Sequence, residues 1–272
     1  MNTKNLWLFD VDNTIIRDVE HPAPFPDALH LCETLEQKGK TIAILTNVGR
    51  LSARQIHTAV TTAGFSVDAD KTFSAGAVAA AYIYSRSPGA RCFVISEGGA
   101  LEDFVARGLN VTNNPPIDFV AVGADRNLTF QQLNFACKMV MKGAALVCIS
   151  GSRDYPGVYL GHEDVFIGER SIAAAIEDAT GKSAFIIGKP LPEIFTETVK
   201  TLRFDVTESV MVGDNPASDV AGGNAAGLTT ILVKRSPDKI VPYDAGDLDT
   251  IPDIAVESLD EVINLLSIVS RE

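Results

Sequence analysis

The chain has 272 residues, of which 46% are apolar, and a formal net charge of −12. The length exceeds the usual size of one domain, so we expect two domains with ordinary globular cores. The negative charge argues against nucleic acid or an anionic membrane as a partner.

The sequence also lacks the patterns of secretion and of a membrane span. Asp10 and Asp12 interrupt the apolar start that a signal segment requires, and apolar stretches such as residues 143–149 are too short to cross a bilayer. The four cysteines have neither CxxC nor metal-like spacing, which favours buried thiols in a reducing compartment. We therefore expect a cytoplasmic protein.

Strand and helix patterns alternate from the beginning of the chain. The apolar run Leu6–Phe9 predicts a buried strand, because it has no polar residue for solvent. The next elements expected are a helix over residues 26–38, a strand over 41–45, a helix from the capping box at Ser52 to Gly64, a strand over 72–74 and a helix over 75–85. Pro88-Gly89 then marks a break.

The alternation begins again at Arg91. We expect strands over residues 92–95, 119–122 and 145–149, and helices over 99–107, 129–143 and 171–179, enough for a separate small core. A third stretch predicts strands over 185–188, 210–212, 230–233 and 254–256, helices over 192–202, 214–226 and 259–269, and a loop over 236–250. Strands that alternate with helices predict an α/β fold with a doubly wound, Rossmann-like parallel sheet.

Two carboxylates follow the first predicted strand, at Asp10 and Asp12. Because strand side chains alternate, both point to the same side, and they repel each other unless a cation or a shared proton relieves them. Mg²⁺ prefers oxygen ligands and is the expected relief. The first acid can then act as a nucleophile and the second as a general acid and base.

Other predicted strands also end in polar residues. Thr46 and Asn47 follow the second strand, and Lys189 and Asp214 follow two later ones. In open α/β sheets ligands bind beyond the carboxyl ends of the strands, so these side chains are expected to meet there. Asp214 would complete a metal site and Lys189 would neutralise a phosphate, a set that suits phosphoryl transfer. Taken singly, each residue is equally typical of a turn, a helix cap or a solvated surface.

The order and spacing of these groups resemble the haloacid dehalogenase (HAD) superfamily of phosphohydrolases. Asp10–Thr14 is similar to the first family motif, Thr46-Asn47 to the second, Lys189-Pro190 to the third and Gly213–Asp219 to the fourth. The insert between the second and third motifs resembles the α/β cap of the nitrophenylphosphatase-like, or NagD-like, branch. The resemblance implies a HAD core over residues 1–88 and 186–272 with an inserted cap domain over residues 89–185.

The resemblance also implies roles for individual residues. Asp10 would form an aspartyl-phosphate, and Asp12 would protonate the leaving group and then activate water. Asp10, the backbone carbonyl of Asp12 and Asp214 would hold Mg²⁺. The phosphoryl group would lie against Thr46, Asn47 and Lys189. Asp219 and Asn215 would support these groups without binding the metal directly.

The chain departs from the family pattern at three places. Asn13 replaces a glycine, which is a mild change because asparagine tolerates left-handed backbone. The segments Ser150–Asp154 and Gly168–Ser171 differ from the usual cap loops. Arg153 in the first of them is a candidate for selecting the substrate, since a guanidinium can bind a carboxylate or second phosphate. Its alternatives are an outer surface position or a pair with Asp154.

The resulting hypothesis is a Mg²⁺-dependent phosphatase that hydrolyses a small phosphorylated metabolite. Sugar phosphates, nucleoside monophosphates, phosphoglycolate and pyridoxal phosphate all remain open as substrates. The alternatives are a phosphotransferase or mutase on the same core, and a non-catalytic metabolite-binding or phospho-receiver module. The family analogy adds a homodimer through the cap.

Overall fold

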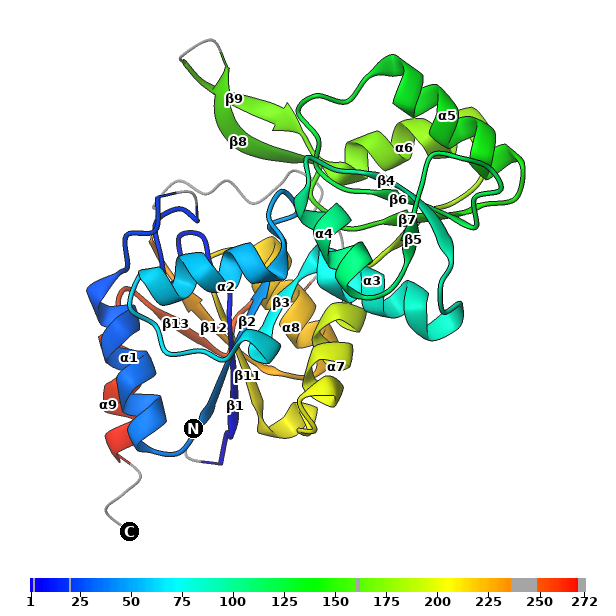
Figure 1. Cartoon of the computed structure of the whole chain (residues 1–272). Helices are drawn as coiled ribbons and strands as arrows, with labels where there is room; N and C mark the ends of the chain where they lie inside the picture. Colours follow the sequence, from blue (N-terminus) through cyan, green and yellow to red (C-terminus); the bar gives the residue numbers. More distant parts are fainter. Residues whose placement is uncertain (2, 20, 160–161, 236–248, 269–272) are drawn as a thin grey trace. The chain divides into compact units, whose positions relative to one another are not determined.

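Apolar strands build two separate sheets in the computed structural model, which describes residues 1, 3–19, 21–159, 162–235 and 249–268 (Figure 1). The chain divides into two compact units. The first comprises Met1–Thr46, Ile56–Phe73 and Lys189–Glu272, and the second comprises Asn47–Gln55 and Ser74–Gly188.

The first unit is built on a six-stranded sheet. Its strands, in the order in which they lie side by side, are β13 (Ile254–Val256), β12 (Thr229–Val233), β11 (Ser209–Gly213), β1 (Leu6–Phe9), β2 (Thr41–Thr46) and β3 (Thr72–Ser74). β1 pairs in parallel with both β2 and β11, and every residue of β1 and β11 is buried. The sheet therefore reverses its winding direction between β1 and β11, as the doubly wound prediction requires.

Helices cover both faces of this sheet. They are α1 (Pro26–Gln37), α2 (Ala53–Thr62), α7 (Pro192–Thr201), α8 (Ala221–Ala226) and α9 (Asp260–Ile268). α1 packs against α9, and α7 packs against α8. Figure 1 shows these two pairs on opposite sides of the strands. Pro26 and Pro192 lie at the first positions of α1 and α7, where a missing N–H costs nothing.

The second unit has its own five-stranded sheet. In spatial order the strands are β10 (Phe185–Ile186), β7 (Ala145–Cys148), β6 (Phe119–Val122), β4 (Arg91–Ile95) and β5 (Asn110–Val111), and all of these neighbours pair in parallel. The helices are α3 (Ala75–Arg86), α4 (Gly99–Ala106), α5 (Phe130–Met141) and α6 (Glu169–Thr180). The α/β fold class predicted for both parts of the chain is thus confirmed.

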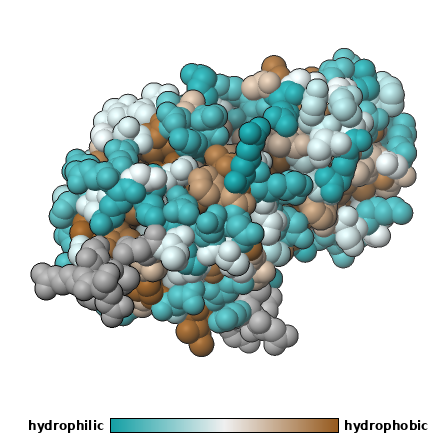
Figure 2. All heavy atoms as spheres, turned by 90° about the horizontal axis from the view of Figure 1, so that it is seen from below, coloured by the Kyte–Doolittle hydropathy of each residue, from teal (hydrophilic) through white to brown (hydrophobic). Residues whose placement is uncertain are grey.

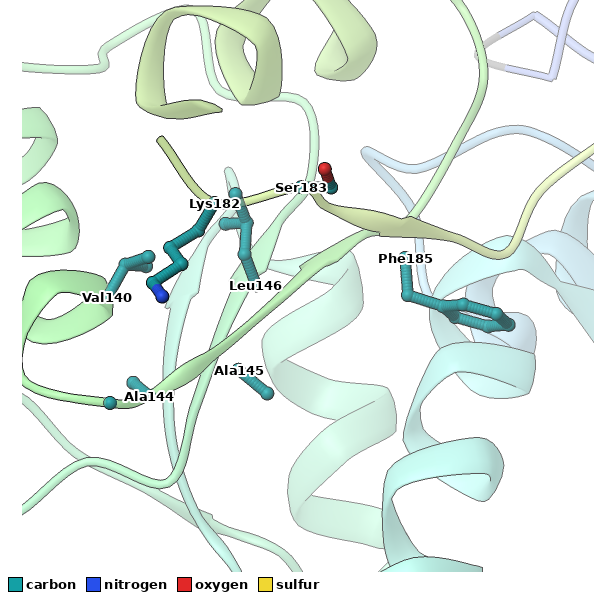
Figure 3. A pocket seen from close by; sticks show the side chains of 8 residues that line it. Val140, Ala144, Ala145, Leu146, Lys182, Ser183 and Phe185 are labelled. Atoms are coloured by element: carbon teal, nitrogen blue, oxygen red, sulfur yellow. The ribbon is translucent and has the colours of Figure 1, made fainter. Parts of the chain in front are cut away.

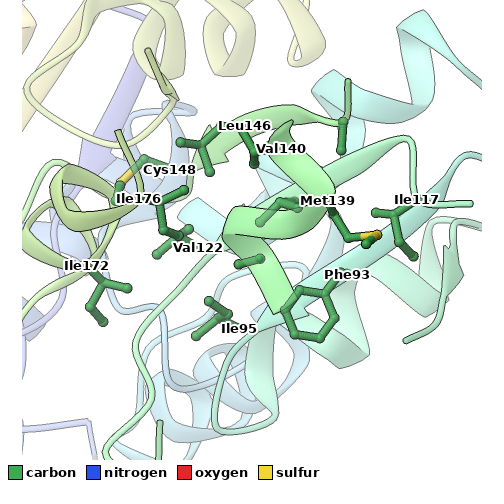
Figure 4. Close-up of a cluster of buried hydrophobic side chains, with 14 residues drawn as sticks. Phe93, Ile95, Ile117, Val122, Met139, Val140, Leu146, Cys148, Ile172 and Ile176 are labelled. Atoms are coloured by element: carbon green, nitrogen blue, oxygen red, sulfur yellow. The ribbon is translucent and has the colours of Figure 1, made fainter. Parts of the chain in front are cut away.

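A hydrophobic core lies between this second sheet and the helix pair α5 and α6 (Figure 4). Alternate residues of β4, β6 and β7 point into it, such as Ile95, Val122 and Leu146, and they meet Met139 of α5 and Ile176 of α6. These side chains form one hydrophobic cluster within the stretch between the second and third motifs.

The second unit differs from the predictions in several features, among them the unpredicted short strand β5. An antiparallel hairpin of β8 (Asp154–Tyr159) and β9 (His162–Ile167) occupies a stretch for which no strand was predicted. Pro156 and Gly157 have low strand propensity, so the sequence of β8 does not indicate a strand. Hydrogen bonding to β9 stabilises the strand in spite of them. In addition, the second unit includes α3, which packs on α4. The observed division between the units falls between Phe73 and Ser74, about one helix earlier in the chain than the boundary predicted between residues 88 and 89.

The described surface is mixed in polarity. Figure 2 shows hydrophilic and hydrophobic side chains interspersed on the face that it displays. Among the described residues, no helix is long and apolar enough to cross a membrane. The loop predicted over residues 236–250 lies almost entirely outside the described residues.

Candidate active site

The reversal point of the first sheet brings two acids to one edge. Asp10 directly follows β1, and Asp214 directly follows β11, the strand beside it. The backbone N–H of Asp10 donates to the Val212 carbonyl at 3.0 Å, which continues the parallel ladder past the end of β1. Both carboxylates are buried. The buried runs on either side therefore determine where the two acids lie.

The Lys189 side chain forms ion pairs with two carboxylates at the same edge of the sheet. Its ammonium donates to Asp10 Oδ1 at 2.7 Å, to Asp219 Oδ1 at 2.6 Å and to the Leu45 carbonyl at 3.2 Å, and only 2% of the residue is exposed. Burial lowers the pKa of the lysine, but the carboxylates of Asp10 and Asp219 outweigh burial and hold that pKa above its ordinary value. The ammonium therefore stays charged.

Two of the three buried acids at this edge, Asp10 and Asp219, pair with this one ammonium. Oxygen atoms of Asp10, Asp214 and Asp219 all lie within 4.8 Å of one another. Burial raises the pKa of Asp219, Lys189 opposes that rise, and the other two carboxylates add to it. One ammonium balances only one of three negative charges, and carboxylate oxygens are the donors that hard divalent cations prefer. The donor set therefore fits Mg²⁺.

Asp219 reaches the cluster through a tight loop and a one-turn π-helix, Pro216–Val220. The Asn215 N–H donates to Asp219 Oδ2 at 3.1 Å, and the Asn215 side chain accepts from the N–H groups of Ala217 and Ser218. A Cβ on Gly213 would lie 2.3 Å from the Asp219 carboxyl carbon. Gly213 begins the fourth motif, and the structure adds the reason for a glycine there: a larger residue would collide with the Asp219 carboxyl.

Asp12 is oriented by the loop that follows it. Its Oδ1 accepts the Val19 N–H at 2.8 Å. Asn13 next to it adopts a left-handed backbone with φ 56°, the conformation that made asparagine an acceptable replacement for glycine there. The Asp12 carboxylate is half-buried and has a defined direction.

The remaining predicted site residues divide between the two units. Thr46 is the buried last residue of β2, the other neighbour of β1. Asn47 is the first residue of the second unit, where a Cβ on Gly188 would lie 2.8 Å from its Oδ1. Arg153 also belongs to the second unit and is exposed, and its backbone carbonyl accepts from Gly168 and Ser171 at the beginning of α6. Its role in selectivity stays a prediction.

Glu169, in one of the divergent cap segments, is a buried acid that received no role from the sequence. It is the first residue of α6, is 3% exposed, and its Oε1 lies so close to Gly49 that a Cβ there would be 2.6 Å away. Burial raises the pKa of its carboxyl to about 7, against the nearby positive charge of Arg50. The sequence indicated this segment only as a departure from the family pattern.

Replacing Glu169 with glutamine is expected to stabilise the protein at alkaline but not at acid pH. A raised carboxyl pKa means that the folded state binds a proton more tightly than the unfolded state, so the free energy of unfolding falls as pH rises from 4.5 to about 7. Glu169→Gln removes this loss, which is up to about 3 kcal/mol. Melting temperatures at about pH 8 and about pH 4.5 measure the difference. Glu193→Gln, at an exposed position, is the control, and equal gains at both pH values would refute the assignment.

A surface hollow of about 400 Å³ lies elsewhere in the second unit (Figure 3). Ala145 at the beginning of β7 and Phe185 at the beginning of β10 line it, together with Lys182. It therefore opens at the amino ends of parallel strands, the opposite end from the one where such sheets bind ligands. We do not assign it to the active site.

Comparisons with known proteins agree with the motifs. A family model for haloacid dehalogenase-like hydrolases matches residues 7–110, and a HAD-hydrolase-like model matches residues 186–262. The 5'-nucleotidase YutF of Bacillus subtilis is 27% identical over 263 residues, which cover 97% of this chain and 99% of that protein. The ribonucleotide monophosphatase NagD of Escherichia coli is 28% identical over 252 residues, 93% of this chain and 94% of that one.

A solved structure extends the similarity to the whole fold. The p-nitrophenyl phosphatase from Archaeoglobus fulgidus superimposes with a TM-score of 0.85 at 25% identity, covering 97% of this chain and 99% of that chain. The family resemblance drawn from the four motifs is thereby confirmed. The chain belongs to the haloacid dehalogenase-like hydrolases, and within them to the NagD-like branch of phosphatases.

Proposed function

We propose that the protein is a Mg²⁺-dependent phosphatase that hydrolyses a small phosphorylated metabolite through an aspartyl-phosphate on Asp10. The observation that carries this proposal is the buried Lys189 ammonium, which donates to both Asp10 and Asp219 at the reversal point of the sheet. A charged lysine beside a carboxylate nucleophile can neutralise the phosphoryl group as it approaches.

In the first step an Asp10 oxygen attacks phosphorus, and the bond between phosphorus and the leaving oxygen breaks. Asp12 donates its proton to that oxygen, so the alcohol leaves neutral. In the second step Asp12 takes a proton from water, the water oxygen attacks phosphorus, and the Asp10 carboxylate is released with inorganic phosphate. The hydrogen bond from Val19 supports this role, because it holds the Asp12 carboxylate in one direction.

The phosphoryl oxygens would be bound by the Thr46 hydroxyl, the Asn47 amide and the Lys189 ammonium. Asp10, Asp214 and the backbone carbonyl of Asp12 would hold Mg²⁺, with Asp219 paired to Lys189. When bound, the ion supplies positive charge that screens the nucleophile and the phosphoryl oxygens from each other.

The substrate class follows from charge and from the relatives. With a net charge of −12, the protein must meet an anionic substrate with local positive groups, as Lys189 provides. The names of YutF and NagD point to nucleoside monophosphates as the first substrates to test. Sugar phosphates, phosphoglycolate and pyridoxal phosphate complete the panel.

Removing divalent metal is expected to abolish turnover of p-nitrophenyl phosphate. Treatment with EDTA should lower kcat/KM by at least about 100-fold, because three acids would then face the phosphate with a single ammonium. Added Mg²⁺ should restore the rate, and Ca²⁺ should not, since its looser coordination disturbs in-line attack. Full activity in EDTA would contradict the metal assignment. Transfer of phosphate to an added alcohol in preference to water would instead indicate a phosphotransferase.

A further inference from the structure

The segment that follows Asn47 has no helix or strand of its own until α2 begins at Ala53. Such a loop lacks the hydrogen-bond ladder of a helix or strand and is more mobile, so a side chain on it is positioned only where other elements anchor its backbone. The residues Asn47–Gln55 belong to the second unit, and most of their contacts described below are with one helix, α4.

The first contact that anchors this segment is a backbone hydrogen bond at the beginning of α4. The Gly99 N–H donates to the Arg50 carbonyl at 3.1 Å. A Cβ on Gly99 would lie 2.3 Å from the Leu51 carbonyl carbon and 2.6 Å from the Arg50 oxygen. Only glycine therefore lets α4 approach the loop this closely.

The second set of anchoring contacts is made by two adjacent acids on α4. Glu102 accepts from the Ser52 hydroxyl at 2.9 Å and from Arg54 Nε at 2.5 Å. Asp103 accepts the Ala53 N–H at 3.0 Å, one of the N–H groups that the beginning of α2 leaves without a helical partner. Together they bind three consecutive residues of the segment, Ser52, Ala53 and Arg54.

Asp103 also holds the other place where the chain enters the second unit. Its Oδ2 accepts from the Ser74 hydroxyl at 2.7 Å, and the Ser74 oxygen accepts the Ala77 N–H at 2.9 Å as the N-cap of α3. Asp103 is only 8% exposed, and burial raises the pKa of its carboxyl to about 6. The two oxygens of this buried acid thus connect the two places where the chain enters the second unit, at Ala53 and at Ser74.

We propose that Asp103, assisted by Glu102, is a positioning residue that holds the Asn47–Gln55 segment so that Asn47 can bind the phosphoryl group. This rests on the proposed function, in which Thr46 and Asn47 bind phosphate. Asp103 acts on phosphate binding through the backbone of the segment. Its loss should weaken phosphate binding and leave the use of Mg²⁺ unchanged.

The test compares Asp103→Ala with Asp103→Asn and with a control, Asp118→Ala. Asp118 also accepts a backbone N–H, from Arg91 at 2.8 Å, but at the amino end of β4. For Asp103→Ala we expect the KM for p-nitrophenyl phosphate and the Ki for inorganic phosphate to rise about tenfold. The Mg²⁺ concentration for half-activation should stay as in the wild type. Asp103→Asn should recover most of the affinity, because its oxygen can accept from Ala53 while its amide donates to Ser74.

Hydrogen exchange measures directly how firmly the backbone of the Asn47–Gln55 segment is held. In Asp103→Ala the amides of residues 50–55 should exchange at least about threefold faster than in Asp118→Ala. If Asp103→Ala does not fold, Glu102→Gln provides the same test at a less buried site, with a smaller rise in the phosphate Ki. Unchanged phosphate affinity in a variant with faster exchange would overturn the proposal, and so would equal losses in Asp118→Ala.

The failure of this inference is separable from failure of the proposed function. Calorimetric binding of inorganic phosphate in the presence of Mg²⁺ requires no turnover. A wild type that binds phosphate but hydrolyses no ester would count against the phosphatase, and the Asp103 comparison would still be decided by binding. A wild type that hydrolyses esters, with Asp103→Ala indistinguishable from it in Ki, would count against the positioning role alone.

Discussion

The Asp10→Asn variant is expected to lose at least about 10⁴-fold in kcat with p-nitrophenyl phosphate, because an amide cannot form the acyl-phosphate. The fold should persist, since the asparagine oxygen can still accept from Lys189 and the exchange removes one of three buried negative charges. Rapid-quench measurement of protein-bound phosphate should find a phosphorylated intermediate in the wild type and none in the variant.

Asp12→Asn is the matched control for this experiment. Its oxygen can still accept the Val19 N–H, so the loop geometry is preserved, while the proton donor is lost. We expect most of the activity to disappear and the affinity for Mg²⁺ to stay, because only the backbone carbonyl of Asp12 is proposed as a ligand. Phosphate release above background from Asp10→Asn, or loss of metal affinity in Asp12→Asn, would reject the roles given to these two acids.

Replacing Lys189 by methionine should have the second largest effect, on both activity and stability. Lys189→Met keeps the length of the side chain but leaves Asp10 and Asp219 without their ammonium, beside the third buried acid, Asp214. Removing one partner of a buried ion pair costs about 3–5 kcal/mol, which for a protein of this size lowers the melting temperature by about 10 °C. In addition, loss of the positive charge that faces the phosphoryl group should lower kcat/KM by about 10²–10³-fold.

Thermal melts of Lys189→Met with and without Mg²⁺ test the electrostatic origin of the effect. A divalent cation bound by the acids should restore part of the lost stability, because it supplies the missing positive charge and binds only the folded state. Lys200→Met is the control, since Lys200 faces Glu197 at 3.8 Å across an exposed helix surface and such pairs contribute little. A melting temperature that does not change in Lys189→Met would mean that the buried ion pair is not important for the fold.

Local sequence patterns predicted most of the elements because the central strands of the two sheets are short and strongly apolar. The run Leu6–Phe9 forms β1, and the capping box at Ser52 forms as expected, with Ser52 and Gln55 bonded to each other's backbone N–H groups. The hairpin β8–β9 was missed, because antiparallel pairing between its strands compensates for residues that disfavour a strand.

The predicted site residues could be proposed because strand ends are visible in sequence and parallel strands place their carboxyl ends on one edge. The roles of Gly213, Glu169 and Asp103 could not. Each depends on a neighbour that is distant in sequence or reached through a loop: Asp219 for Gly213, Gly49 for Glu169, and Ala53 and Ser74 for Asp103. A lone glycine or acid in a sequence carries no signal of such a neighbour.

The α/β class, the family and the acids and lysine at the strand ends can be predicted from sequence alone, because they follow from hydrophobic periodicity and from motifs of a few adjacent residues. That one ammonium, on Lys189, lies between Asp10 and Asp219, and that α4 anchors the segment after Asn47, is visible only in the folded structure. Both depend on how strands and helices from distant parts of the chain pack. That packing is set by the sum of many apolar contacts across each core, which no single stretch of sequence contains.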